Sequence, residues 1–372
     1  MEFRMERGEL TDAVSRAARV LPVRSPVPVL GGLLLDADAG RLRVSGTDFE
    51  ASVRVEAQAH TVRPGKALVM GRRLLDICKV LPEGPVECAV EGSRLTVTAD
   101  GSRFGLSVLP LDDYPSLPPL PEVRGTVDAG EFASAVAHVA VAAGRDGTLP
   151  ALTGIRLGLD GSTMTLAATD RYRFAVRGLP FKATAPDVTA DVLVPARRLA
   201  EIARSLGRTG QVDVAVDGGS AGFEHAGTRT TVRLLDGRLP RHDKLFAMTE
   251  PAVATMDRAS LVEAVKRVSV VADGGSPLQM TFSAAPDGSV LLQAGFEDDV
   301  ASQRLPAALD GTAGMTVAFN PAYLMDALSS FEDTTVRLKL MGPGQRAMIT
   351  HGEDPGAATH QHLLMSVKPP LL

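Results

Sequence analysis

The sequence predicts an α+β protein built from three copies of one domain. Three segments follow the same order: an amphipathic helix, a strand pair with a glycine-containing turn, a second helix and closing strands. A leucine holds the same place in each second helix, at Leu74, Leu199 and Leu324, with intervals of 125 residues each. Chance hardly supplies such an ordered set, so we predict three homologous domains at 1–120, 121–248 and 249–372.

The opening helix of each copy is predicted from the spacing of its apolar residues. These stretches begin at Gly8, Gly130 and Ala259. Apolar residues recur there at helical spacing, as in Leu10, Ala13, Val14, Ala17 and Leu21 of the first copy and Leu261, Val265 and Val268 of the third.

The strands and boundaries follow from turn residues and alternation. A strand pair follows each opening helix, with turns predicted at Ala39-Gly40, Asp160-Gly161 and Asp287-Gly288. Closing strands alternate apolar positions, as in Leu95, Val97 and Ala99 or Val212, Val214 and Val216. The first boundary falls in 112–121, which contains four prolines, and the second falls in 246–256 around Pro251.

Composition limits the classes of function. Hydrophobic residues make up 45% of the chain and aromatic residues 4%, with no Trp, so Val, Leu and Ala must form the cores. A net charge of -5 favours an acidic protein without a DNA partner unless basic residues gather on one surface. Cys78 and Cys88 follow no metal spacing and are expected to be buried in a reducing compartment. Neither a signal sequence nor a membrane span is recognisable, which predicts a cytoplasmic protein.

Basic residues gather on the polar faces of several predicted helices. Arg72, Asp76 and Lys79 share one face, and the second copy places Arg197, Glu201, Arg204 and Arg208 together. The opening helices add Arg16, Arg19, Lys266 and Arg267, whereas the third copy's second helix has no Lys or Arg. Such faces are usually solvated and stabilised by ion pairs along the helix. Alternatively, equivalent helices line one channel and contact phosphates without reading sequence. The residues alone leave both interpretations open.

Three patterns that would suggest an enzyme or a metal site are weak. Residues 218–222 fit G-x-S-x-G but lie between two strands, so we predict a turn there and no nucleophile. Gly342-Pro343-Gly344 lacks the helix that a dinucleotide loop needs. His351, His360 and His362 lack a complete ligand set, and we predict that they belong to a solvated loop. No cofactor is expected, and a hydrolase using Ser220 or these histidines is a remote alternative.

The sequence resembles the bacterial DNA sliding clamp, the β subunit of the replicative polymerase, over essentially the whole chain. The resemblance rests on ordered stretches that include RSPVPVLGGLLL (24–35), GTDFE (46–50), LLDICKVLPEG (74–84), SRFGLSVLPLDDYPSL (102–117), LTGIRL (152–157), ATDRYRFAV (168–176), VPARRLAEI (194–202), LLDGRLP (234–240) and FNPAYLMDAL (319–328). It implies a non-catalytic processivity factor that encircles double-stranded DNA. It also implies a head-to-tail homodimer, with six domains in a ring and helices lining the hole.

The resemblance also implies where the protomers join. Phe104 and Leu106 match apolar contacts of the first domain, and Val270 and Val271 match those of the last domain. Glu297, Asp298 and Asp299 match an acidic stretch that faces basic residues such as Arg103. Opposite charges at the two ends suit a head-to-tail interface.

DNA contacts are implied at Arg24 and Arg72, which match family positions that touch DNA. The family's further contacts precede LTGIRL, but here the segment 145–151 lacks the aromatic pair, and Arg145 stands as a substitute. The candidate phosphate contacts are Arg24, Arg72, Arg73, Lys79, Arg145, Arg197, Arg198 and Arg204.

The resemblance further implies a pocket between the second and third domains that takes short peptides of clamp partners, including the polymerase III α subunit, other polymerases and the clamp loader. The matching positions are Leu152, Thr169, Arg171, Tyr172, Arg173, Phe174, Pro240, Lys244, Leu245, Tyr323, Ala347, Leu363, Leu364, Met365, Ser366, Val367 and Lys368. A few apolar anchors in a desolvated groove usually carry such binding. Without the resemblance, the same residues would be interpreted as core packing at a domain junction.

The C-terminal tail departs from the family's usual Met-Pro-Met/Val-Arg-Leu ending. Ser366 restores an N–H where proline has none, and Lys368 lacks the planar fork of arginine. Lys244 and the Arg241-His242 pair also differ from the usual Arg and Asp-Tyr, and Pro369 to Leu372 lengthen the end. We therefore predict a pocket-variant clamp, as a second clamp copy would be, with altered affinity for partner peptides or for small molecules that imitate them. The alternative is a clamp-like scaffold that does not act on DNA.

Overall fold

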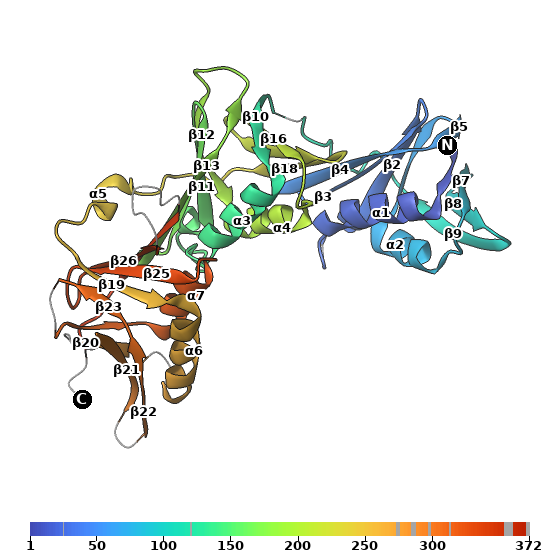
Figure 1. The fold of residues 1–372 in the computed structure, drawn as a ribbon. Helices are drawn as coiled ribbons and strands as arrows, with labels where there is room; N and C mark the ends of the chain where they lie inside the picture. The colour runs from blue at the N-terminus through green and yellow to red at the C-terminus, as the bar shows by residue number, and fades with distance from the viewer. Residues whose placement is uncertain are drawn as a thin grey trace. The chain divides into compact units, whose positions relative to one another are not determined.

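The computed structural model describes residues 1–372 except 25, 120, 273–275, 284–287, 297–298, 312–313, 353–359 and 370–372 (Figure 1). The chain divides into two compact units. The first unit comprises Met1–Ala129, Ala183–Ala185 and Ser205–Leu234, and the second comprises Gly130–Lys182, Pro186–Arg204 and Leu235–Leu372.

The strands of the first unit lie in one fourteen-stranded sheet, in the order β14-β10-β16-β17-β18-β4-β3-β2-β6-β9-β8-β7-β1-β5. Their bounds are β1 (Glu2–Glu6), β2 (Gly32–Asp38), β3 (Arg41–Thr47), β4 (Ala51–Gln58), β5 (His60–Arg63), β6 (Gly65–Met70), β7 (Pro85–Glu91), β8 (Arg94–Ala99), β9 (Ser102–Leu109), β10 (Val123–Asp128), β14 (Lys182–Ala183), β16 (Gln211–Val216), β17 (Ser220–His225) and β18 (Thr228–Arg233). Ala39 and Gly40 both adopt positive φ between β2 and β3, as a tight hairpin turn requires.

Two helices of the first unit lie side by side: α1 (Arg7–Ala17) and α2 (Gly71–Val80) (Figure 1). The predicted stripe Leu10, Ala13, Val14, Ala17 and Leu21 is buried, but α1 ends at Ala17, so Leu21 lies beyond the helix. Helix α1 packs on β4. On α2, Leu74 and Cys78 are buried whereas Arg72, Asp76 and Lys79 are exposed. The helical periodicity therefore predicted the buried faces correctly.

The second unit contains two antiparallel sheets. The nine-stranded sheet has the order β15-β11-β12-β13-β27-β26-β25-β19-β23, and the four-stranded sheet has the order β22-β21-β20-β24. Their bounds are β11 (Gly154–Asp160), β12 (Thr163–Thr169), β13 (Arg173–Pro180), β15 (Thr189–Pro195), β19 (Ala252–Asp257), β20 (Leu278–Ser283), β21 (Ser289–Phe296), β22 (Asp299–Pro306), β23 (Ala308–Asp310), β24 (Thr316–Phe319), β25 (Thr335–Leu340), β26 (Arg346–His351) and β27 (His360–Met365). The predicted turn residue Asp287 lies outside the described residues.

The remaining helices are α3 (Ala129–Ala140), α4 (Ala196–Ser205), α5 (Asp243–Phe246), α6 (Arg258–Val268) and α7 (Pro321–Ser329). Because α4 ends at Ser205, Arg208 does not share its face with Arg197 and Arg204, contrary to the sequence prediction. The Asn320 side chain caps α7 by accepting bonds from the N–H groups of Ala322 and Tyr323, at 2.9 and 3.2 Å.

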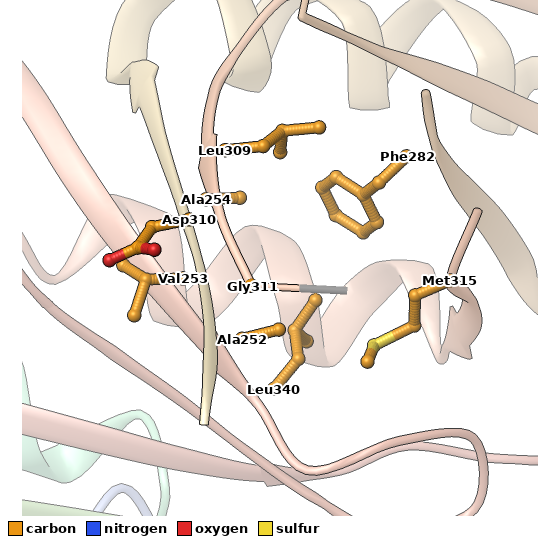
Figure 2. Close-up of a pocket in the computed structure, with 9 residues that line it drawn as sticks. All are labelled: Ala252, Val253, Ala254, Phe282, Leu309, Asp310, Gly311, Met315 and Leu340. Carbon is orange, nitrogen blue, oxygen red and sulfur yellow. The ribbon is translucent and has the colours of Figure 1, made fainter. Parts of the chain in front are cut away.

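Helices α6 and α7 cover the core of the last predicted domain, which the two sheets of the second unit enclose (Figure 1). A small recess opens in this core between β19, β23 and the four-stranded sheet, and Phe282, Leu309 and Met315 point into it (Figure 2). Gly311 lines it with φ +102°, and a Cβ there would meet Ala252 Cα at 2.9 Å. Packing therefore requires glycine at this turn.

Strand pairing runs across both predicted domain boundaries. In the first unit β4 pairs with β18, and in the second unit β13 pairs with β27. Each pair joins one predicted domain to the next through backbone hydrogen bonds.

Candidate peptide-binding site

A tight turn between β12 and β13 holds the first part of the candidate site. The Thr169 hydroxyl donates to Arg173 O at 2.6 Å, and Asp170 Oδ1 accepts from the N–H groups of Tyr172 and Arg173. Arg171 adopts φ +83° inside this turn. The local bonds hold a backbone that a non-glycine residue rarely adopts, and they place Arg171 and Tyr172 at the surface.

Arg173 is the buried charge of the site. Its guanidinium pairs with Asp170 at 2.9 Å and with Asp326 on α7 at 2.7 Å, and only 4% of its side chain is exposed. It also lies over the Tyr323 ring, 4.3 Å from the centroid. A buried guanidinium needs this pairing, so Arg173 fastens the β12–β13 turn to α7.

Two tyrosines form the accessible aromatic surface. The rings of Tyr172 and Tyr323 stack with centroids 6.3 Å apart, and Tyr172 is 54% exposed. Burial is the main cause that raises the pKa of Tyr323 above its ordinary value, with Asp170 adding to the effect. The Tyr323 phenol is neutral at pH 7, and both rings offer a flat apolar face with a polar edge.

The linker before the last domain covers one side of the same sheet. His242 and Phe246 pack their rings against Phe174, with centroids 6.1 and 5.6 Å away. Burial lowers the pKa of His242, so this imidazole is uncharged at neutral pH. Arg346 on β26 donates to the carbonyls of Lys244 and Leu245, at 3.2 and 2.8 Å. These bonds fix the linker backbone where Leu245 is exposed.

The C-terminal strand completes the arrangement. Met365 N–H donates to Tyr172 O and Val367 N–H to Ala318 O, both at 2.8 Å. Ser366 is buried: its N–H donates to Gln345 O at 3.0 Å, and its hydroxyl donates to the same oxygen at 2.7 Å. The side chains of Met365 and Val367 remain exposed. The tail therefore exposes two apolar side chains, while hydrogen bonds to Tyr172, Gln345 and Ala318 hold its backbone in place.

The predicted pocket residues all lie in the second unit, but only some are accessible. Exposed members are Arg171, Tyr172, Pro240, Lys244, Leu245, Met365, Val367 and Lys368. Ala347, Leu363 and Leu364 are buried and support the sheet, and Leu152 is half-buried in a short 3-10 turn (Pro150–Thr153). The site also contains Asp170, Asp326 and Phe246, which the sequence pattern did not predict. For Asp326 the available signal was its position three residues after Tyr323 on one helix.

The candidate phosphate contacts are exposed with one exception. The first unit carries Arg24, Arg72, Arg73 and Lys79, and the second carries Arg145, Arg197 and Arg204; Arg198 is half-buried. Both Arg197 and Arg198 pair with Glu201 at 3.1 Å, which partly neutralises them. The positive charge of Arg145 acts to lower the pKa of Tyr323, against the larger effect of burial. Arg16, a further helix arginine, bonds Ala226 O and Thr228 Oγ1 at 3.0 Å.

The candidate interface residues lie in both units. Val270 is 83% exposed and Val271 is half-buried at the end of α6. Leu106 is buried, Phe104 is half-buried, and Arg103 pairs with Glu91 at 3.1 Å. Asp299 is exposed at the start of β22, whereas Glu297 and Asp298 lie outside the described residues.

The histidine prediction was wrong. His360 and His362 are not in a solvated loop: they lie on β27 and are 1% and 0% exposed, and His351 ends β26. His360 donates to or accepts from Ser330 Oγ at 2.9 Å and contacts Val176 O at 3.1 Å. Burial lowers the pKa of His360 to about 2 and that of His362 to about 3. An uncharged imidazole can be buried when it is hydrogen-bonded. The prediction of a solvated loop did not take this into account.

The remaining enzyme-like patterns are structural in the described part of the chain. Ser220 starts β17, and its hydroxyl and N–H both bond Asp217 Oδ1 in a tight turn. Cys78 and Cys88 are buried free thiols, and burial raises the pKa of Cys78 to about 12. Within the described residues, acidic, histidine and cysteine side chains form no metal-binding group, and no helix is long and apolar enough to cross a membrane.

Comparison with known families identifies the three repeats. Residues 1–118, 126–241 and 244–367 match the N-terminal, central and C-terminal domains of the DNA polymerase III beta subunit. The beta sliding clamp of Streptomyces coelicolor is 46% identical over 356 residues, covering 94% of both chains. A beta sliding clamp homolog named GriR, from Streptomyces muensis, is 43% identical over 352 residues, covering 94% of this chain and 93% of the relative.

Solved structures share the fold. A Pseudomonas aeruginosa polymerase III beta subunit superposes with a TM-score of 0.92 at 24% identity, covering 99% of this chain and 100% of that one. Another from the same organism, described as bound to griselimycin, gives 0.91, 24% identity and 99% coverage of both chains.

These matches define the class of the protein: a three-domain α+β sliding clamp, a non-catalytic accessory subunit for DNA replication. The chain belongs to the DNA polymerase III beta subunit family.

Proposed function

We propose that the protein forms a head-to-tail homodimeric ring around double-stranded DNA in the cytoplasm and tethers polymerases and the clamp loader through the second unit's surface. The three family domains, matched in order over nearly the whole chain, carry this proposal. The predicted boundaries at 1–120, 121–248 and 249–372 remain part of it. The exposed arginines and Lys79 would contact phosphates weakly and without sequence preference, as sliding requires.

Retention on DNA tests the ring. After loading, the protein should stay on nicked circular DNA and leave when that DNA is linearised, even at salt that abolishes phosphate contacts. Equal loss from both forms would indicate a simple basic patch. Absence of any retention would favour the clamp-like scaffold that does not act on DNA.

We further propose that the peptide site is a variant, as expected of a second clamp copy. Ser366 supports this proposal because its N–H and hydroxyl both bond Gln345 O, a constraint that proline cannot make. His242 packs on Phe174 and Phe246, and Lys244 presents a point charge in place of an arginine fork. Both residues lie in the linker whose backbone Arg346 on β26 binds at Lys244 and Leu245.

Calorimetry tests the variant site. A standard clamp-binding peptide and griselimycin would each be titrated into this protein and into the Streptomyces coelicolor relative. Altered anchor contacts should change affinity by tenfold or more, about 1.4 kcal/mol. Equal affinities for both ligands would refute the variant site and leave the clamp function standing.

A further inference from the structure

The joint between β4 and β18 in the first unit repeats the architecture of the candidate peptide site. Thr47 Oγ1 donates to Ala51 O at 3.0 Å, and Asp48 Oδ1 accepts from the N–H groups of Glu50 and Ala51. The same bonds hold Thr169, Asp170 and Arg173 in the second unit. The strained residue recurs too, because Phe49 has φ +73° where Arg171 has φ +83°.

The strand that follows is fastened in the same way in both places. Arg233 N–H donates to Glu50 O at 2.8 Å, as Met365 N–H does to Tyr172 O. Leu234 N–H donates to Gly219 O at 3.0 Å, as Ser366 N–H does to Gln345 O. The two joints are therefore equivalent in backbone, residue by residue.

Their side chains differ in chemistry. In the second unit Phe174, Val176 and Leu363 form an apolar cluster that Phe246 covers. The strand registers place Ser52, Arg54 and Thr231 at the corresponding positions of the first unit. There these residues line a groove together with Arg229, Leu117 and Pro118 of the preceding linker.

Three of the four polar side chains that line this groove have no partner among the residues that the structure describes. Ser52 and Thr231 are 7% and 6% exposed, and neither hydroxyl bonds any of the residues that the structure describes. Arg229 pairs with Glu224 at 2.6 Å, but Arg54, opposite Arg229 in the register, pairs with none of the described carboxylates. The hydroxyls of Ser52 and Thr231 and the exposed guanidinium of Arg54 are therefore available to an external ligand that supplies acceptors.

We propose that this groove binds an acidic peptide segment of a partner protein, with a carboxylate on Arg54 and an apolar side chain beside Phe49. Phe49 is 62% exposed on the turn that precedes β4, the strand that carries Arg54, so this turn offers an aromatic anchor. The peptide class rests on the proposed function of the equivalent site, whereas the anionic preference rests on Arg54 and its two hydroxyl neighbours.

Fluorescence polarisation with the full chain tests the proposal. The probe is a labelled peptide, Asp-Glu-Leu-Phe-Asp-Glu, and its matched control replaces every acid by the amide. We expect saturable binding of the acidic peptide and at least tenfold weaker binding of the amide peptide. Arg54→Ala should weaken binding at least tenfold, and Phe49→Gly, which suits the positive φ, should weaken it several-fold. Arg43→Ala, which removes a partly exposed arginine paired with Glu56, should leave binding unchanged.

Tyr323→Ala separates this groove from the second unit's site. Binding that persists in Tyr323→Ala and is lost in Arg54→Ala supports the proposal, whatever becomes of the proposed clamp function. Loss in Tyr323→Ala alone assigns the peptide to the other site and overturns the inference. Absence of saturable binding, insensitivity to Arg54→Ala, or displacement by a short duplex oligonucleotide at equal concentration also overturns it.

Discussion

At the scale of single residues, the candidate peptide site depends on a buried charge that is fully paired. Arg173 meets two carboxylates and an aromatic face, and this combination fixes Tyr323 relative to the β12–β13 turn. An ion pair of this kind contributes little net stability, but removing one partner is costly because the other charge stays buried.

Asp326→Ala should therefore destabilise the protein by about 2 kcal/mol, the usual loss for a hydrogen bond to a charged group. Chemical denaturation followed by circular dichroism measures this change. Asp310→Ala, which removes an exposed carboxylate from β23, serves as the control and should stay within about 0.5 kcal/mol of the unmodified protein. Equal effects of the two substitutions would show that Asp326 does not hold Arg173 in solution.

Ser366 contributes to stability through two hydrogen bonds to Gln345 O, one from its N–H and one from its hydroxyl. Two substitutions separate their effects. Ser366→Ala removes the hydroxyl bond and should cost about 1 kcal/mol, whereas Ser366→Pro removes both and should cost about 2 kcal/mol. Urea unfolding of both variants measures the difference. If Ser366→Pro unfolds no more easily than Ser366→Ala, the N–H bond to Gln345 contributes nothing.

At the scale of elements, the sequence pattern predicted those features that depend on residues close together in the chain. The buried faces of α1 and α2 and the Ala39-Gly40 turn follow from spacing and turn chemistry. The pairing of Arg173 with Asp326 could not be predicted in this way, because 153 residues separate the partners. Likewise, β27 buries His360 and His362 only because β13 and β26 flank it, and composition of the segment gave no sign of that.

The buried histidines of β27 make stability depend on pH. Burial holds the pKa of His362 at about 3 and that of His360 at about 2, while burial and then Arg177 hold that of His138 at about 4. In the unfolded chain these groups titrate near 6.5. Below pH 6.5 these histidines therefore bind protons in the unfolded chain but remain neutral in the folded chain. The stability is fully present above pH 6.5 and falls as the pH decreases toward 4.

His362→Leu tests this dependence, since leucine keeps the volume and cannot bind a proton. Thermal unfolding between pH 7 and pH 5 should show a shallower loss of stability for the variant, by up to about 1.4 kcal/mol per pH unit. His60→Leu, on exposed strand β5, should leave the slope unchanged. Parallel pH profiles for all three proteins would contradict the assignment of the slope to β27.

At the scale of the whole molecule, backbone pairing blurs the domain boundaries that the repeats predict. Because β4 pairs with β18 and β13 with β27, each joint lies inside a continuous sheet, and the contacts of the chain form two units although three family domains match. Repetition in the sequence thus predicts the number of copies of the fold. The division of the chain into compact units depends instead on which strands of adjacent copies pair.

The proposed homodimer leads to a prediction about mass and one residue. Two chains of 39.0 kDa should sediment together near 78 kDa at micromolar concentration. Val270 is 83% exposed, and in a ring it would be buried against the partner protomer. Val270→Asp would place a charge in that apolar contact and should yield protomers near 39 kDa. Val23→Asp is a matched control, because Val23 is 85% exposed but lies outside the predicted interface. Sedimentation velocity of the three proteins distinguishes the outcomes: a dimer that survives Val270→Asp would exclude this residue from the joint, and a protomer in all three samples would exclude the ring.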